Sequence, residues 1–145
     1  MTHKIFDIIV VGAGLAGLAQ ACLLARAGFS VLQLEAAPLP RLGDQHYDLR
    51  TTALSFASKK ILEELGLWAE LDAGACPIRD IRIADGNVPG YLHFNAAEVD
   101  ADAFGWIVEN HRLRAVLTAH LQKYKNVELR APVKVTDLKY GAVDI

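Results

Sequence analysis

The sequence predicts an α/β fold with a parallel β-sheet, to which a β-hairpin or meander is added. A β-branched run at 8–11 leads into a glycine-rich turn at 12–17, and a helix of small residues follows. A second apolar strand, 30–34, comes after that helix and ends at Glu35. From Pro77 onward, helical periodicity is replaced by alternation, which is typical of antiparallel strands.

The turn carries the spacing Gly12-x-Gly14-x-x-Gly17. Gly12 would allow a sharp turn after the strand, and Gly14, without a Cβ, would let a diphosphate approach the main chain. Gly17 would let the helix pack close to the sheet. The phosphates would then meet the unpaired N–H groups around Leu15 and Ala16, at the positive end of the helix dipole. This order predicts the phosphate-binding corner of a Rossmann-like βαβ unit.

Glu35 stands at the end of the second strand, about twenty residues past the glycines. A carboxylate there can accept both hydroxyl hydrogens of an adenosine ribose, and its charge would repel a 2′-phosphate. The pattern therefore favours FAD or NAD over NADP.

Two other interpretations remain open. Between residues 8 and 25 only Gln20 has a polar side chain, which is compatible with a signal peptide or membrane helix. Against this, glycines interrupt the run, Asp7 precedes it, and Gly28 leads into another strand. The second alternative is a buried βα corner that binds no ligand.

Composition limits the function classes. A chain of 145 residues, 52% of them hydrophobic, suits one domain with a sizeable core. The net charge of −2 gives no electrostatic case for nucleic acid or an anionic membrane surface. The histidines are scattered without metal-ligand spacing, so we expect no metal site. Cys22 and Cys76 are distant in sequence and indicate reduced thiols of a cytoplasmic protein.

The first half of the chain predicts a strand at 5–11 and a helix at 15–27 that is buried on more than one side and capped by Gly28. A long connection at 36–50 follows the second strand, and such loops at the carboxyl edge of a parallel sheet usually carry function. Next, 51–66 predicts one helix ending at Gly66. Its apolar face would comprise Leu54, Ala57, Ile61, Leu62 and Leu65.

The second half predicts a helical turn at 68–71 and a hairpin of 78–84 with 88–94, joined by a turn at 85–87. A loop at 95–104 and a short strand at 105–109 follow. Asn110 then caps a helix. The remaining expectations are an apolar helix face of Leu113, Val116, Leu117 and Leu121, a parallel strand at 127–130, an antiparallel ribbon with Val133, Val135 and Leu138, and a return strand at 140–145. A strand opening at Ala142 lacks a partner, so we expect an amino-terminal portion of a longer protein.

Two segments, taken with the glycine motif and Glu35, resemble a known family. Residues 48–55, Asp-Leu-Arg-Thr-Thr-Ala-Leu-Ser, are similar to the flavin-dependent aromatic hydroxylases. Residues 105–113, Gly-Trp-Ile-Val-Glu-Asn-His-Arg-Leu, resemble the ubiquinone-biosynthesis branch, which hydroxylates polyprenyl phenols. The resemblance covers essentially the whole chain and implies FAD as cofactor. It also implies that the substrate domain and the later Asp-Gly and Gly-Asp-Ala flavin motifs lie beyond residue 145.

The resemblance assigns roles to matching positions. Gly12, Gly14 and Gly17 match the diphosphate contacts and Glu35 the ribose contact. Arg50 matches an arginine near the flavin and its phosphates, Asn110 a position that touches the flavin, and Val133 a main-chain contact to the adenine. Simpler alternatives are an exposed Arg50–Asp48 ion pair and a purely capping Asn110, and Val133 is expected to be a core residue as well as a contact. Relatives often carry a basic residue near the phosphates directly after the ribose-binding acid, whereas this chain has Ala36 there.

For the full protein the resemblance implies an oxidoreductase, a monooxygenase that uses NAD(P)H and O2 to hydroxylate a small aromatic, polyprenylated substrate. Peripheral membrane association is compatible with such a substrate. No catalytic residue is assigned, because Asp48, Glu109 and His111 form no constellation by spacing. The alternatives are the NAD-binding domain of a dehydrogenase and a nucleotide-binding fragment without catalysis.

Overall fold

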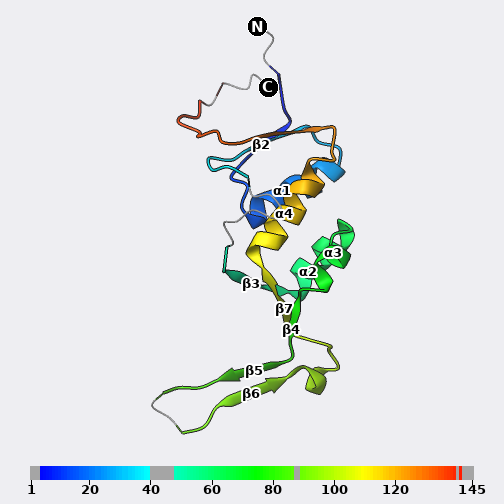
Figure 1. Cartoon of the computed structure of the whole chain (residues 1–145), viewed down its shortest axis with the longest axis vertical. Helices are drawn as coiled ribbons and strands as arrows, with labels where there is room; N and C mark the ends of the chain where they lie inside the picture. The colour runs from blue at the N-terminus through cyan, green and yellow to red at the C-terminus, as the bar shows by residue number, and fades with distance from the viewer. Residues whose placement is uncertain (1–3, 40–47, 87–88, 140, 142–145) are drawn as a thin grey trace. The chain divides into compact units, whose positions relative to one another are not determined.

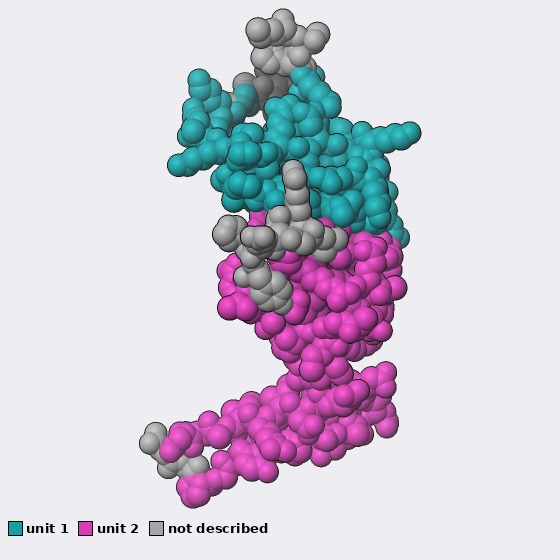
Figure 2. Space-filling view, in the orientation of Figure 1, with its two compact units in different colours: residues 1–41, 117–145 teal, residues 42–116 magenta. Residues whose placement is uncertain are grey.

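The computed structural model describes residues 4–39, 48–86, 89–139 and 141 (Figure 1). The chain divides into two compact units, one formed by residues 1–41 and 117–145 and the other by residues 42–116 (Figure 2). Helix α4 (Asn110–Leu121) begins in the second unit and ends in the first.

The first unit contains a parallel sheet in the order β1 (Ile8–Val11), β2 (Val31–Leu34) and β8 (Val127–Arg130). Helix α1 (Leu15–Arg26) connects β1 to β2, so the predicted βαβ unit is confirmed. Each of the first two strands begins later than expected.

One face of α1 is buried, and its members are Leu18, Ala21, Cys22 and Ala25. The other positions are half-buried or exposed, so the helix is enclosed less fully than its composition predicts. The helix ends at Arg26 with Ala27 as its C-cap, and Gly28 follows with φ +95°, as predicted for a left-handed cap. Asn126 Nδ2 donates to the carbonyls of Ala25 (2.8 Å) and Phe29 (2.7 Å), which ties this end to the start of β8.

The second unit is built on an antiparallel sheet in the order β3 (Thr51–Ser55), β7 (Gly105–Glu109) and β4 (Cys76–Ile78). The prediction of one helix over 51–66 is wrong in its first third. Thr51–Ser55 pairs with β7 over its whole length, and α2 (Phe56–Glu64) begins only after Ser55, whose Oγ accepts from the Ser58 N–H at 3.2 Å.

The expected apolar stripe of that helix is therefore broken. Leu54, Leu62 and Leu65 are buried, but Ala57 and Ile61 are exposed. Gly66, with φ +72°, ends the helical segment as predicted.

Helix α3 (Trp68–Asp72) confirms the predicted helical turn. The rings of Trp68 and Trp106 meet edge to face at 5.6 Å, and Lys59 Nζ lies 4.2 Å from the Trp106 ring centroid. The predicted apolar face of α4 is confirmed, since Leu113, Val116, Leu117 and Leu121 are all buried.

Strands β5 (Asp80–Ile83) and β6 (Leu92–Asn95) form the predicted antiparallel hairpin (Figure 1). The residues before it form β4, which pairs with β7 and not with the hairpin. A 3₁₀ helix, η1 (Ala96–Val99), begins the segment predicted as a loop.

The predicted ribbon with Val133, Val135 and Leu138 is wrong, because residues 131–139 form no strand and these three side chains are exposed. A ribbon needs a partner strand, whereas the Val133 N–H donates instead to the Glu35 carbonyl at 2.7 Å. The predicted return strand at 140–145 lies outside the described residues apart from Gly141, as does much of the 36–50 connection. In the part of the chain that the structure describes, no helix is long and apolar enough to cross a membrane.

Candidate nucleotide-binding site

The turn between β1 and α1 depends on Gly12. This residue has φ +101°, a backbone conformation that L side chains rarely adopt. Its N–H donates to the Leu34 carbonyl at 2.7 Å, and its own carbonyl accepts from Gln33 Nε2 at 2.6 Å. The turn is thus fixed to β2 on both sides of Gly12.

Gly14 and Gly17 differ in what surrounds them. A Cβ added at Gly17 would collide with the Gly12 carbonyl, so α1 can approach the turn only because this side chain is absent. A Cβ added at Gly14 would meet nothing within 4 Å. Gly14 therefore faces open space, with the bare backbone that an approaching diphosphate needs.

The amino-terminal end of α1 lies next to that space. Gly14 is the N-cap, no side chain caps the helix, and no acidic residue occupies its first turn. The first helical hydrogen bond runs from the Leu18 N–H to the Gly14 carbonyl at 2.9 Å. The N–H groups of Leu15, Ala16 and Gly17 precede it and have no acceptor within the helix, which leaves donors suited to an anion.

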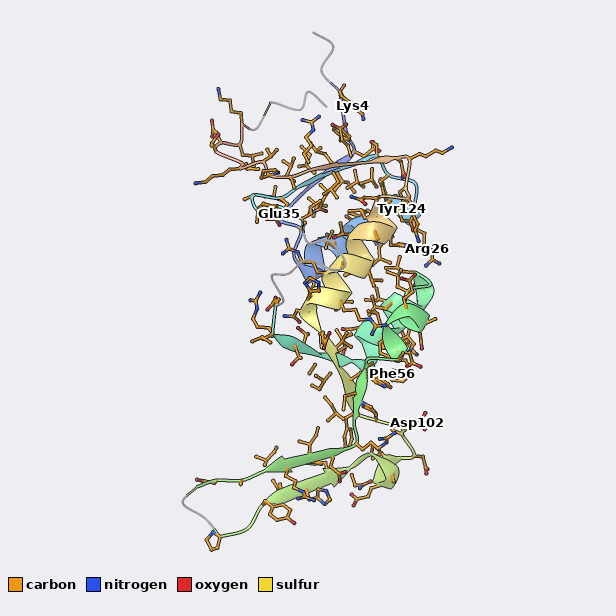
Figure 3. The ribbon with its side chains drawn as sticks, viewed as in Figure 1. Lys4, Arg26, Glu35, Phe56, Asp102 and Tyr124 are labelled. Atoms are coloured by element: carbon orange, nitrogen blue, oxygen red, sulfur yellow. The ribbon has the colours of Figure 1, made fainter. Side chains whose placement is uncertain are left out.

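Glu35 directs its carboxylate at the turn from the end of β2 (Figure 3). Oε2 accepts from the Ala13 N–H at 2.6 Å and Oε1 accepts from the Ala37 N–H at 2.8 Å. The backbone of Glu35 is held as well, because its N–H donates to the Arg130 carbonyl at 3.0 Å and its carbonyl accepts from Val133. A carboxylate presented beside the turn can accept the two hydroxyl groups of a ribose.

In the first unit the structure therefore brings together the predicted residues Gly12, Gly14, Gly17, Glu35 and Val133. Val133 joins them through its main chain, and its side chain is 40% exposed. The expectation that Val133 is also a core residue is therefore wrong.

Arg50 and Asn110 belong to the second unit. Arg50 Nε and Nη2 each donate to Asp48 at 2.8 Å, a two-pronged ion pair on an exposed surface. Hydrogen bonds from Arg50 lower the pKa of the Asp48 carboxyl to about 2, and the same carboxylate raises the pKa of Arg50. The structure thus contains the exposed Arg50–Asp48 ion pair, which was the simpler alternative for Arg50.

Asn110 begins α4 directly after β7. Its N–H donates to the Arg50 carbonyl at 3.0 Å, and its Oδ1 accepts from Thr52 Oγ1 at 2.5 Å. The side-chain oxygen is engaged by β3, and a Thr52 hydroxyl therefore orients the Asn110 amide.

Sequence reasoning missed two of these residues, Gln33 and Thr52. Gln33 could have been noticed as the polar residue within the apolar second strand. Thr52 carries no comparable signal, because its partner lies far along the chain. Among the described residues, no three His, Cys, Asp or Glu side chains are grouped as a metal site would require.

The chain matches known proteins over most of its length. A family profile described as "FAD binding domain" matches residues 6–139. The ubiquinone hydroxylase UbiL of Rhodospirillum rubrum is 36% identical over 136 residues, which are 94% of this chain and 32% of the relative. The 3-demethoxyubiquinol 3-hydroxylase of Escherichia coli is 36% identical over 134 residues, 91% of this chain and 34% of that protein.

Solved structures agree with this match. The p-nitrophenol 4-monooxygenase PnpA of Pseudomonas putida has a TM-score of 0.68 at 26% identity, over 89% of this chain and 32% of that one. The myxobacterial halogenase CndH, described as a variant of FAD-dependent halogenases, has a TM-score of 0.74 at 25% identity. The match covers 96% of this chain and 31% of that one. The chain spans about a third of the length of the relatives it matches.

Proposed function

Because the chain belongs to the FAD binding domain family, we propose that it forms the adenosine and diphosphate half of the FAD site in a flavoprotein monooxygenase. The diphosphate would lie over Gly14 and meet the N–H groups of Leu15, Ala16 and Gly17. Glu35 would accept the ribose hydroxyls, and the Val133 main chain would contact the adenine edge. The observation that carries this proposal is the Glu35 carboxylate, held 2.6 Å from the Ala13 nitrogen beside an uncapped helix.

We extend the proposal to the second unit. Arg50 offers a planar, permanently charged group that can pair with phosphate oxygens in two-pronged geometry, as it does with Asp48. Asn110, whose Oδ1 is engaged by Thr52, would present its amide N–H groups to an acceptor on the flavin.

The reaction we propose is hydroxylation of a phenolic, polyprenylated quinone precursor with NAD(P)H and O2. Its support is the similarity to one protein named a ubiquinone hydroxylase and to another named a 3-demethoxyubiquinol 3-hydroxylase. Bound FAD would supply the electron transfer and dioxygen activation. This chain, as the amino-terminal part of the FAD-binding domain, would bind and orient the cofactor. Because its substrate is lipid-like, the protein would work at a membrane surface.

Titration with FAD tests the proposal, with NAD as the competing ligand. We expect FAD to bind stoichiometrically and NAD to fail to displace it. NAD(P)H oxidation would then be measured with and without a phenol, and we expect stimulation by the phenol. A protein that binds no FAD, or that exchanges it freely for NAD, would overturn the proposal.

A further inference from the structure

The peptide unit that joins Gly12 to Ala13 is held at both ends, by the side chain of Gln33 in β2 and by that of Glu35, which directly follows β2. Gln33 Nε2 donates to its carbonyl oxygen at 2.6 Å, and Glu35 Oε2 accepts from its N–H at 2.6 Å. Glu35 continues the hydrogen bonding of β2 to β8, because its N–H donates to the Arg130 carbonyl, so the side chains of residues 33 and 35 leave the same face of the sheet. The two contacts therefore fix the rotation of this peptide about its neighbouring bonds.

Gln33 is an unusual residue for its place. It is completely buried in the parallel sheet, and within the described residues its Oε1 has no hydrogen-bond partner. Exchanging the two ends of the amide would set its oxygen against the Gly12 carbonyl, so the donor must face the turn. A buried acceptor without a partner costs free energy, and an apolar side chain would fill the same space without that cost.

We propose that Gln33 is a positioning residue for FAD, holding the Gly12 carbonyl beneath the turn and away from the diphosphate. The carbonyl lies against Gly17, where a Cβ would collide with it, so it points into the protein. If the peptide rotated, this oxygen would face the phosphate oxygens, and the Ala13 N–H would leave Glu35. The inference rests on the proposed FAD site and adds to it a residue whose benefit appears on binding and not in the stability of the fold.

The test compares Gln33→Met, which keeps an unbranched side chain but cannot donate, with Leu32→Met on the opposite face of the same strand. We expect Gln33→Met to raise the Kd for FAD about tenfold, because the Gly12–Ala13 peptide would no longer be fixed before FAD binds and part of the binding free energy would be used to order it. The melting temperature of the FAD-free protein should stay the same or rise. Hydrogen exchange of the Ala13 amide should become faster. Leu32→Met should leave the FAD affinity and this exchange rate unchanged.

The outcomes separate the two proposals. A wild-type protein that binds no FAD overturns the proposed function and this inference with it. A wild-type protein that binds FAD, with unchanged affinity and Ala13 exchange in Gln33→Met, overturns the inference alone. Equal losses of FAD affinity and FAD-free stability would show ordinary packing and also overturn it. Gln33→Leu serves as the second variant, with the same expectations, if Gln33→Met does not fold.

Discussion

The Ala13 N–H and the Glu35 carboxylate meet at 2.6 Å, although 22 positions separate them in the chain. This contact joins the turn after β1 to the end of β2. In the proposed FAD site, it would place a negative charge beside the ribose while the neighbouring N–H groups of α1 face the diphosphate. A single ligand could therefore use both the carboxylate and the helix N–H groups only if it carries both a ribose and a diphosphate.

Replacing Glu35 with Gln should weaken FAD binding about 10- to 100-fold, because hydrogen bonds to a charged acceptor are stronger than those to an amide. The measurement is the Kd from flavin fluorescence. Glu98→Gln, which removes one negative charge outside the site, is the matched control. An unchanged Kd in Glu35→Gln would remove the ribose role of this residue.

Gly17→Ala should destabilise the protein by about 1–3 kcal/mol, since the new methyl group must push the Gly12 carbonyl or α1 aside. Urea denaturation without FAD measures this loss. Wild-type stability in Gly17→Ala would contradict the close approach of helix and turn.

Gly14→Ala should behave differently. Its φ of −72° and ψ of 177° suit alanine, and its surroundings are open, so the FAD-free stability should change by no more than about 1 kcal/mol. FAD affinity should nevertheless fall, because the methyl group would occupy space that the diphosphate needs. Tight FAD binding by Gly14→Ala would contradict the proposed path of the diphosphate.

Thr52→Val should cost about 1–2 kcal/mol, because Asn110 Oδ1 loses the hydroxyl that it accepts from. Thr52→Ser should retain most of the stability. The control is Thr51→Val on the same strand, at an exposed position where valine suits a β-strand equally well. Equal unfolding midpoints for Thr52→Val and Thr51→Val would show that the hydrogen bond contributes nothing.

Asp48 should add to acid sensitivity. Its folded-state pKa is about 2, below the ordinary value of 3.8, because Arg50 donates to its carboxylate. A lowered folded pKa means that its contribution is present above pH 3.8 and is lost as the pH falls toward 2. Asp48→Asn should therefore flatten the pH dependence of the unfolding free energy in this window. The pair is exposed, so the change should be small. If the unfolding free energy of Asp48→Asn fell with acid as steeply as that of the wild type, the Asp48–Arg50 pair would not be maintained in solution.

The sequence predicted the βαβ unit well because its signals are local. The glycine spacing and the acid that follows the second strand both lie within about 25 residues of sequence. The apolar periodicity from Leu113 to Leu121, which predicted the buried face of α4, is local in the same way. For Thr51–Ser55 the sequence predicts a helix, because Leu54 continues the apolar spacing of α2, whereas the strand β7 that decides its conformation lies about 50 residues away in the chain. Val133 was misjudged for the same reason, since alternation alone does not supply a partner strand.

The site was predictable to a similar degree. Gly12 and Glu35 belong to a known spacing, so sequence alone could bring them together. The proposed role of Gln33 depends on which face of β2 it occupies and on where the Gly12 carbonyl points. Neither can be predicted from the neighbouring residues alone. The orientation of Asn110 likewise depends on Thr52, a contact that forms only when β3 and β7 pair.

Because Gln33 in β2 and Glu35 directly after it project from the same side of the sheet, any change in the number of residues within β2 acts on both at once. Inserting a single residue between Val31 and Gln33 would turn the amide and the carboxylate to the other side of the sheet together. Insertions at the carboxyl end of α1 would leave that alternation intact. Evolution could therefore vary the length of this crossover far more freely than the length of the strand that follows it.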